Sequence, residues 1–115
     1  GSKVTEMAGG IFFQRFMRPM MLKQEPDDDL VESIINNQLP PMLDYLESQV
    51  PPEGFLFDSL GVADLALASP FVNAGYAGYE VDPERWPQFA AFCARVRAHE
   101  IVAPLLQAEA KMLGL

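Results

Sequence analysis

Apolar residues recur at intervals of three and four positions along most of this chain, which is the spacing of one face of an α-helix. Leu39, Met42, Leu43 and Leu46 give one clear example. No stretch alternates polar and β-branched apolar residues for long enough to predict a strand. The pattern therefore predicts an all-α fold, and short loops between five such segments favour a five-helix bundle.

Proline, glycine and aspartate mark where these helices are expected to begin and end. We expect helices over residues 5–23, about 30–49 and about 62–74, a fourth from Pro87 that carries Phe89 to Val96, and a last one from Ile101 to Met112. Pro26 is expected to end the first helix, and Pro19 to bend it. Pro40 and Pro41 are expected to kink the second helix, because its apolar spacing continues beyond them.

Length and charge exclude several classes of protein. The 115 residues suit one domain, and 16 acidic against 8 basic residues give a net charge of −8, which argues against binding nucleic acid or an anionic membrane. No apolar run is long enough for a membrane span, and no signal peptide is recognisable, so we expect a cytoplasmic protein. Residues 1–2 are interpreted as a tag remnant and residues 3–115 as the domain.

The segment SLGVADLALASPF, residues 59–71, has the features of a helix start. With Gly61 at the N-cap, Asp64 occupies the third helical position, from which a carboxylate can accept the exposed N–H groups of the cap region. Leu60 and Leu65 have the spacing of a hydrophobic staple. The aspartate therefore belongs to the start signal of an apolar helix.

The motif Leu60-Gly61-Val62-Ala63-Asp64-Leu65 resembles the one that opens a buried helix in the helical C-terminal domain of cytosolic glutathione transferases, of the bacterial type. The segments FFQRFMRP (12–19), LPPMLDYLE (39–47) and RWPQFAAFCARVRAHE (85–100) are similar to the same domain, in the same order. Gly61 replaces the usual hydroxyl-bearing cap, and Glu100 replaces a proline often found there.

The resemblance implies that the whole protein has two domains with different functions. In the family, glutathione and the residue that activates its sulfur belong mainly to an N-terminal thioredoxin-like domain, and nothing in this chain is similar to that domain. The whole protein is thus expected to conjugate glutathione, its co-substrate, to hydrophobic electrophiles. The helical domain would shape the pocket for the second substrate, form part of a homodimer interface, contain no catalytic residue and be inactive alone.

The first helix contains the candidates for that pocket. Phe12 and Phe16 belong to a dense group of aromatic and methionine side chains, and Arg15 lies on the flank of the same segment. Large, adaptable side chains suit a promiscuous pocket. Simple core packing explains the same residues about as well, so both interpretations stay open.

Other chemically notable residues are better explained by structure. Cys93, the only cysteine, lies on an apolar face and is expected to be an inert core thiol. His99 is expected near a helix end, Asp27 to Asp29 at a solvated helix start, and Trp86 in the core. One histidine and one cysteine cannot supply a tetrahedral metal site, and no cofactor is expected in this domain.

A second class of function also fits this fold. Domains that resemble this one occur in translation factors and multisynthetase proteins, where they mediate assembly, and in regulators without catalytic activity. A non-catalytic interaction or regulatory module is therefore the alternative to a transferase domain. Glutathione binding by the whole protein separates the two.

Overall fold

The computed structural model describes residues 2–115, and within them every regular element is helical. The elements are α1 (Ser2–Phe12), η1 (Phe13–Met21), α2 (Asp28–Ser33), η2 (Ile34–Gln38), α3 (Leu39–Gln49), α4 (Val62–Tyr76), α5 (Pro87–Ala98) and α6 (Val102–Met112). The two η segments have wider, π-type turns and continue the adjoining α-helices without a break. The chain therefore forms five continuous helices, which confirms the predicted all-α fold.

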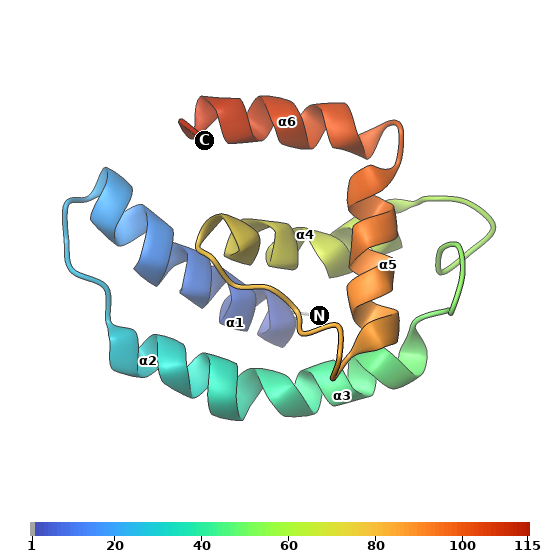
Figure 1. Ribbon diagram of the computed structural model, residues 1–115, viewed down its shortest axis with the longest axis horizontal. Helices are drawn as coiled ribbons and strands as arrows, with labels where there is room; N and C mark the ends of the chain where they lie inside the picture. Colours follow the sequence, from blue (N-terminus) through green and yellow to red (C-terminus); the bar gives the residue numbers. More distant parts are fainter. Residues whose placement is uncertain (1) are drawn as a thin grey trace.

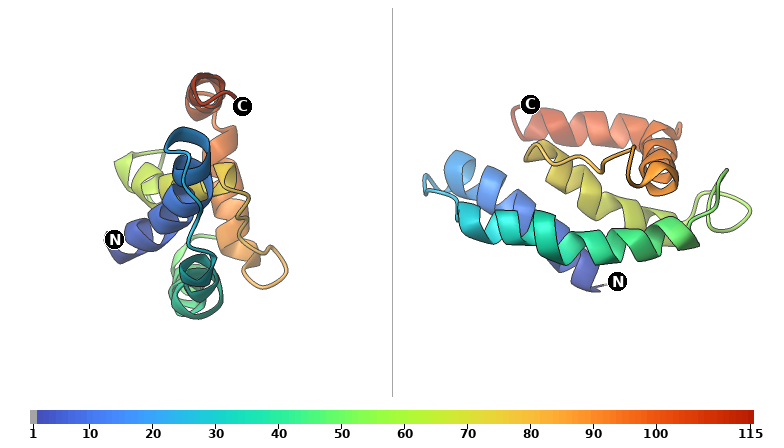
Figure 2. Two further views of the ribbon diagram at one scale, coloured as in Figure 1. Left: turned by 90° about the vertical axis from the view of Figure 1, so that its left-hand side faces the viewer. Right: turned by 60° about the horizontal axis from the view of Figure 1, so that its bottom comes forward.

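Helix α4 lies in the middle of the bundle (Figure 1). It packs against α1 on one side and against α5 on another, and α3 contacts both α1 and α5. The α2–α3 helix runs along one edge of the molecule, and α6 lies along the opposite edge, where it packs mainly on α5 (Figure 2). Helix α6 is thus the least embedded part of the bundle.

The core is centred on aromatic rings of α4 and α5. Phe89 is fully buried, with its ring centroid 5.1 Å from that of Phe71 in an edge-on contact and 6.3 Å from that of Phe92. Leu39 and Leu43 of α3 are also fully buried. These side chains join α3, α4 and α5 into one unit, which fixes the surfaces on which a site can form.

The second helix continues through Pro40 and Pro41 as one helix, as predicted, and a wide turn directly precedes the prolines. Pro40 and Pro41 lack the N–H groups that would continue the regular pattern, and the N–H of Leu39 donates to the carbonyl of Ile34, five residues back. In a regular α-helix a five-residue step would rotate a side chain by about 140° from the starting face. Because the wide turn reduces that rotation, both Ile34 and Leu39 remain buried.

The first helix ends earlier than the sequence predicted. It ends at Met21, not Lys23, so Pro26 is not its terminator. Lys23 adopts a left-handed conformation with φ of 55°, and the N–H of Gln24 donates to the carbonyl of Arg18. A left-handed residue reverses the chain direction, which is a common way to end a helix.

Side chains of α3 hold the start of α5. The Glu47 carboxylate accepts the N–H groups of Gln88 and Phe89 at 2.9 and 2.8 Å. The indole N–H of Trp86 donates to Asp44 Oδ1 at 2.8 Å, and its ring is buried, as expected. Two acidic side chains of α3 thus stabilise the start of a helix that lies more than 40 residues later in the chain.

Glycine ends α4 and directs the chain into the next loop. Gly78 has φ of 89°, its N–H donates to the carbonyl of Gly75, and the N–H of Tyr79 donates to that of Ala74. This pair of bonds is a Schellman motif, which needs a left-handed residue at the position of Gly78. The motif places Tyr79 and the residues after it beside α5.

Candidate functional site

Asp64 connects the start of α4 to the loop before it. The side chain is completely buried; Oδ2 accepts the N–H of Gly61 at 2.8 Å, and Oδ1 accepts the N–H of Leu56 at 2.9 Å. Gly61 has an extended backbone and no side chain, so only the Asp64 half of a capping box can form. Leu60 and Leu65 are both partly buried against the core. The motif therefore has a structural role, holding a helix start and a loop in place.

Arg95 fastens the same loop from α5. Its guanidinium donates to the carbonyls of Gly54 and Pro51, both at 3.0 Å. Asp64 and Arg95 therefore fix both halves of the segment between α3 and α4. Both side chains form hydrogen bonds with backbone groups of the loop, so their role is structural rather than catalytic.

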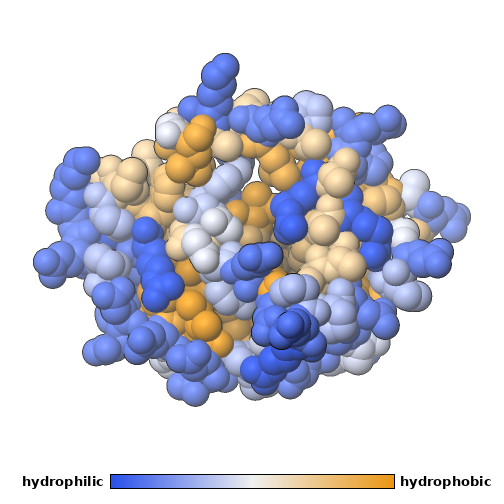
Figure 3. Space-filling view, viewed as in Figure 1, coloured by the Kyte–Doolittle hydropathy of each residue, from blue (hydrophilic) through white to orange (hydrophobic). Residues whose placement is uncertain are grey.

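A hollow lies between α4, the 78–83 segment, α5 and α6. Its volume is about 870 Å³, within the range of small-molecule sites. Apolar side chains are visible inside it, below α6 (Figure 3). Its wall residues are Phe71, Val72, Gly75, Tyr76, Gly78, Tyr79, Glu80, Val81, Pro83, Pro87, Ala90, Ala91, Cys93, Ala94, Arg97, Leu106, Gln107 and Ala110. We call this hollow the α4–α6 cavity.

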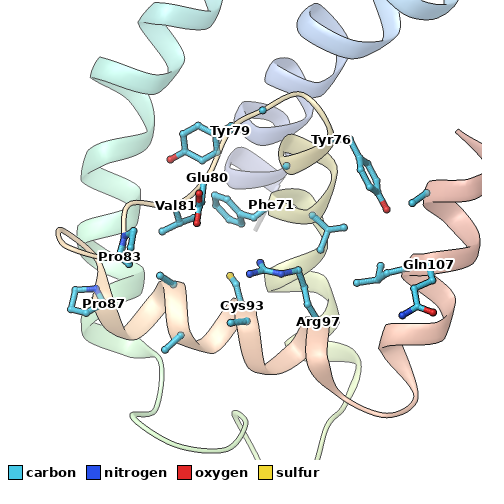
Figure 4. Close-up of a pocket in the computed structure, with 18 residues that line it drawn as sticks. Phe71, Tyr76, Tyr79, Glu80, Val81, Pro83, Pro87, Cys93, Arg97 and Gln107 are labelled. Atoms are coloured by element: carbon cyan, nitrogen blue, oxygen red, sulfur yellow. The ribbon is translucent and has the colours of Figure 1, made fainter. Parts of the chain in front are cut away.

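Arg97 and Cys93 lie together in the wall formed by α5. In Figure 4 the Arg97 guanidinium and the Cys93 sulfur point toward one another below Phe71. Burial raises the pKa of the Cys93 thiol to about 12, an effect that the positive charge of Arg97 only partly opposes. The thiol is therefore protonated at neutral pH and cannot act as a nucleophile or supply a thiolate.

Two tyrosines line the cavity near the end of α4. The Tyr76 hydroxyl donates to Glu109 Oε1 of α6 at 2.9 Å, and burial together with this bond raises its pKa to about 12. Burial, with the nearby Asp82 carboxylate, raises the pKa of Tyr79 to about 12, which Arg85 partly opposes. Both hydroxyls therefore stay protonated at neutral pH and can serve as hydrogen-bond donors.

The pocket candidates of the first helix lie outside the α4–α6 cavity but close to its edge. The rings of Phe12 and Phe16 are stacked with centroids 5.3 Å apart, and Phe12 lies 6.4 Å from the ring of Tyr76, a cavity residue. Phe16 is buried, Phe12 is partly buried and Arg15 is exposed on η1. The aromatic pair thus adjoins the cavity through Tyr76, while Arg15 faces outward.

The remaining candidates have local structural partners. Cys93 is buried, as predicted. His99 lies at the end of α5, where Nδ1 accepts the N–H of Ile101, and Ile101 precedes α6 rather than opening it. Asp27 caps α2 by accepting the N–H of Leu30 at 3.1 Å.

The described residues contain neither a cluster of metal-binding side chains nor a helix that could span a membrane. Between residues 2 and 115 no three His, Cys, Asp or Glu side chains gather in a way that could hold a metal ion. The helices of the same stretch include none with the length and apolar character needed to cross a membrane.

Comparison with known proteins decides the family. Residues 29–95, more than half of the chain, match the sequence family described as "Glutathione S-transferase, C-terminal domain". The chain belongs to this family. No curated protein and no solved structure gives a match.

The part of the chain that matches the glutathione S-transferase C-terminal domain extends from α2 through most of α5, so it includes the Asp64 motif. Sequence reasoning found that motif but missed the cavity residues of this domain, Arg97 above all. A signal was present: Pro87, Ala90, Ala94 and Arg97 recur at helical spacing on one side of α5. The small side chains in that pattern leave room for a cavity beside α5, and Arg97 is the last residue of the pattern.

Proposed function

We propose that this domain is the helical part of an enzyme that transfers glutathione to hydrophobic electrophiles. Family membership carries the proposal. It is supported by the properties of Cys93, whose protonated thiol suits neither attack on an electrophile nor activation of glutathione. We therefore assign activation of the glutathione sulfur to an N-terminal thioredoxin-like domain. The helical domain is assigned the binding of the second substrate.

The first helix is proposed to provide the apolar wall for the second substrate. Phe12 and Phe16 form a stacked pair, and Arg15 is exposed one residue before Phe16, where it can face the glutathione-binding domain. Several large apolar side chains of η1 and its end are exposed: Phe13, Met20, Met21 and Leu22. An apolar surface of this kind is typical of a contact site, so we propose that it is covered by the thioredoxin-like domain or by the second subunit of a homodimer.

The transfer assay tests this proposal. The chain of 115 residues, mixed with glutathione and a nitroaryl chloride, is expected to give no rate above buffer, whereas the whole protein from its source is expected to turn over. In the whole protein, Phe16→Ala should raise KM for the aryl chloride several-fold and leave KM for glutathione nearly unchanged. Asp58→Ala, at an exposed position of the loop before α4, is the control. Turnover by the chain alone, or a whole protein that binds no glutathione, contradicts the proposal; the latter favours a non-catalytic module.

A further inference from the structure

The α4–α6 cavity combines an apolar wall with one cation, and this combination points to a ligand. Apolar side chains from α4, α5 and α6 make up most of the wall, including Phe71, Val72 and Leu106. The alanines at positions 90, 91 and 94 keep the α5 side of the cavity open. A space of about 870 Å³ with such a wall suits an apolar body of small-molecule size.

The cavity wall contains one positive side chain, Arg97, which favours an anionic group on the ligand. The Arg97 guanidinium extends from α5 toward α4 beside Cys93 (Figure 4). Within residues 2–115, the structure gives this guanidinium no hydrogen-bond or ion-pair partner. A planar guanidinium next to an apolar wall binds a carboxylate through two parallel hydrogen bonds. Gln107 of α6 and the hydroxyl of Tyr79 are neutral donors in the wall, whereas the Tyr76 hydroxyl already donates to Glu109.

We propose that the α4–α6 cavity binds a small apolar carboxylate, with its carboxylate on Arg97 and its apolar part against Phe71, Val72 and Leu106. This site is separate from Phe12 and Phe16, and the proposal does not depend on glutathione transfer. The chain has a net charge of −8, so its overall field repels anions. Binding must therefore depend on the local charge of Arg97.

Glu80 provides an internal check on the assignment. Its carboxylate also lines the cavity, near Val81, and has the same sign as the ligand's charged group. Removing the Arg97 charge should weaken binding, whereas removing the Glu80 charge should strengthen it. Opposite effects from two lining residues would be hard to obtain from a general loss of structure.

The test is calorimetric titration of the 115-residue chain with decanoate, and with 1-decanol as a neutral probe of the same chain length. Decanoate is expected to bind one to one with a Kd on the order of 10⁻⁴ M, and more tightly than 1-decanol. Arg97→Gln should weaken decanoate binding about tenfold and leave 1-decanol unchanged, while Arg97→Lys should recover part of the loss. Glu80→Gln should tighten decanoate binding two- to threefold.

Two further variants locate the binding. Ala94→Phe fills the cavity from α5 and should abolish binding of both probes, with circular dichroism verifying that the helices are retained. Lys111→Gln removes a positive charge from α6 outside the cavity wall and should change nothing. Equal affinity for decanoate and 1-decanol would overturn the carboxylate assignment. Unchanged binding by Ala94→Phe would place the ligand elsewhere and overturn the site.

Discussion

Replacing Asp64 with alanine is expected to lower the free energy of unfolding by about 3 kcal/mol. The carboxylate is completely buried and accepts two backbone N–H groups, those of Gly61 and Leu56. Alanine leaves both donors without their partner and removes the only side chain that can cap this start of α4. Because Gly61 has no side chain, the N-cap residue itself cannot compensate.

Urea denaturation of Asp64→Ala, followed by the fluorescence of buried Trp86, provides the measurement. Asp58→Ala is the matched control, since Asp58 is exposed in the same loop and its replacement should change stability by less than about 0.5 kcal/mol. If the two variants were equally stable, Asp64 would have no special role in holding the loop and the helix start. In that case the sequence motif would need a functional rather than a structural explanation.

Raising the pH from 9 toward 11 is expected to destabilise the fold through Cys93. Burial raises the pKa of this thiol from 9.0 to about 12, so the folded chain keeps a proton that the unfolded chain loses. The stabilisation is complete below pH 9 and is lost as the pH rises toward 12. The loss from this one group is about 1 kcal/mol between pH 9 and pH 10, and about 2 kcal/mol by pH 11.

Cys93→Ala isolates this contribution. Between pH 9 and pH 10 the unfolding free energy of the variant should fall by about 1 kcal/mol less than that of the original chain. Above pH 10 both proteins should lose further stability, because the pKa values of Tyr76 and Tyr79 are also raised to about 12. Parallel curves for the two proteins between pH 9 and pH 10 would show that the Cys93 thiol is not buried as described.

Local patterns predicted most of the fold. The apolar spacing gave the five helices, and the buried faces of α3 and α5 follow it through Leu39, Leu43 and Phe89. The Asp64 motif was recognisable because its partner Gly61 lies three residues away. Such features depend on neighbours in sequence, which is why sequence reasoning can find them.

Features that depend on distant segments were missed. Glu47 stabilises the start of α5 from 41 positions away, and only the packing of α3 against α5 brings them together. Similarly, the α4–α6 cavity depends on where α6 lies, and α6 is fixed by few contacts besides those with α5. The early end of the first helix depends on the left-handed backbone at Lys23, a position where no glycine indicates such a conformation.

Whether this domain belongs to a two-domain transferase is tested by the intact mass of the protein that contains this sequence, captured from its source cells with an antibody to this domain. A glutathione transferase with a thioredoxin-like domain is expected to be heavier by about 80 to 100 residues, with the additional sequence N-terminal to Thr5. Peptide mapping of that addition identifies it. A native protein no larger than 115 residues would contradict the two-domain account and leave a helical interaction module as the function.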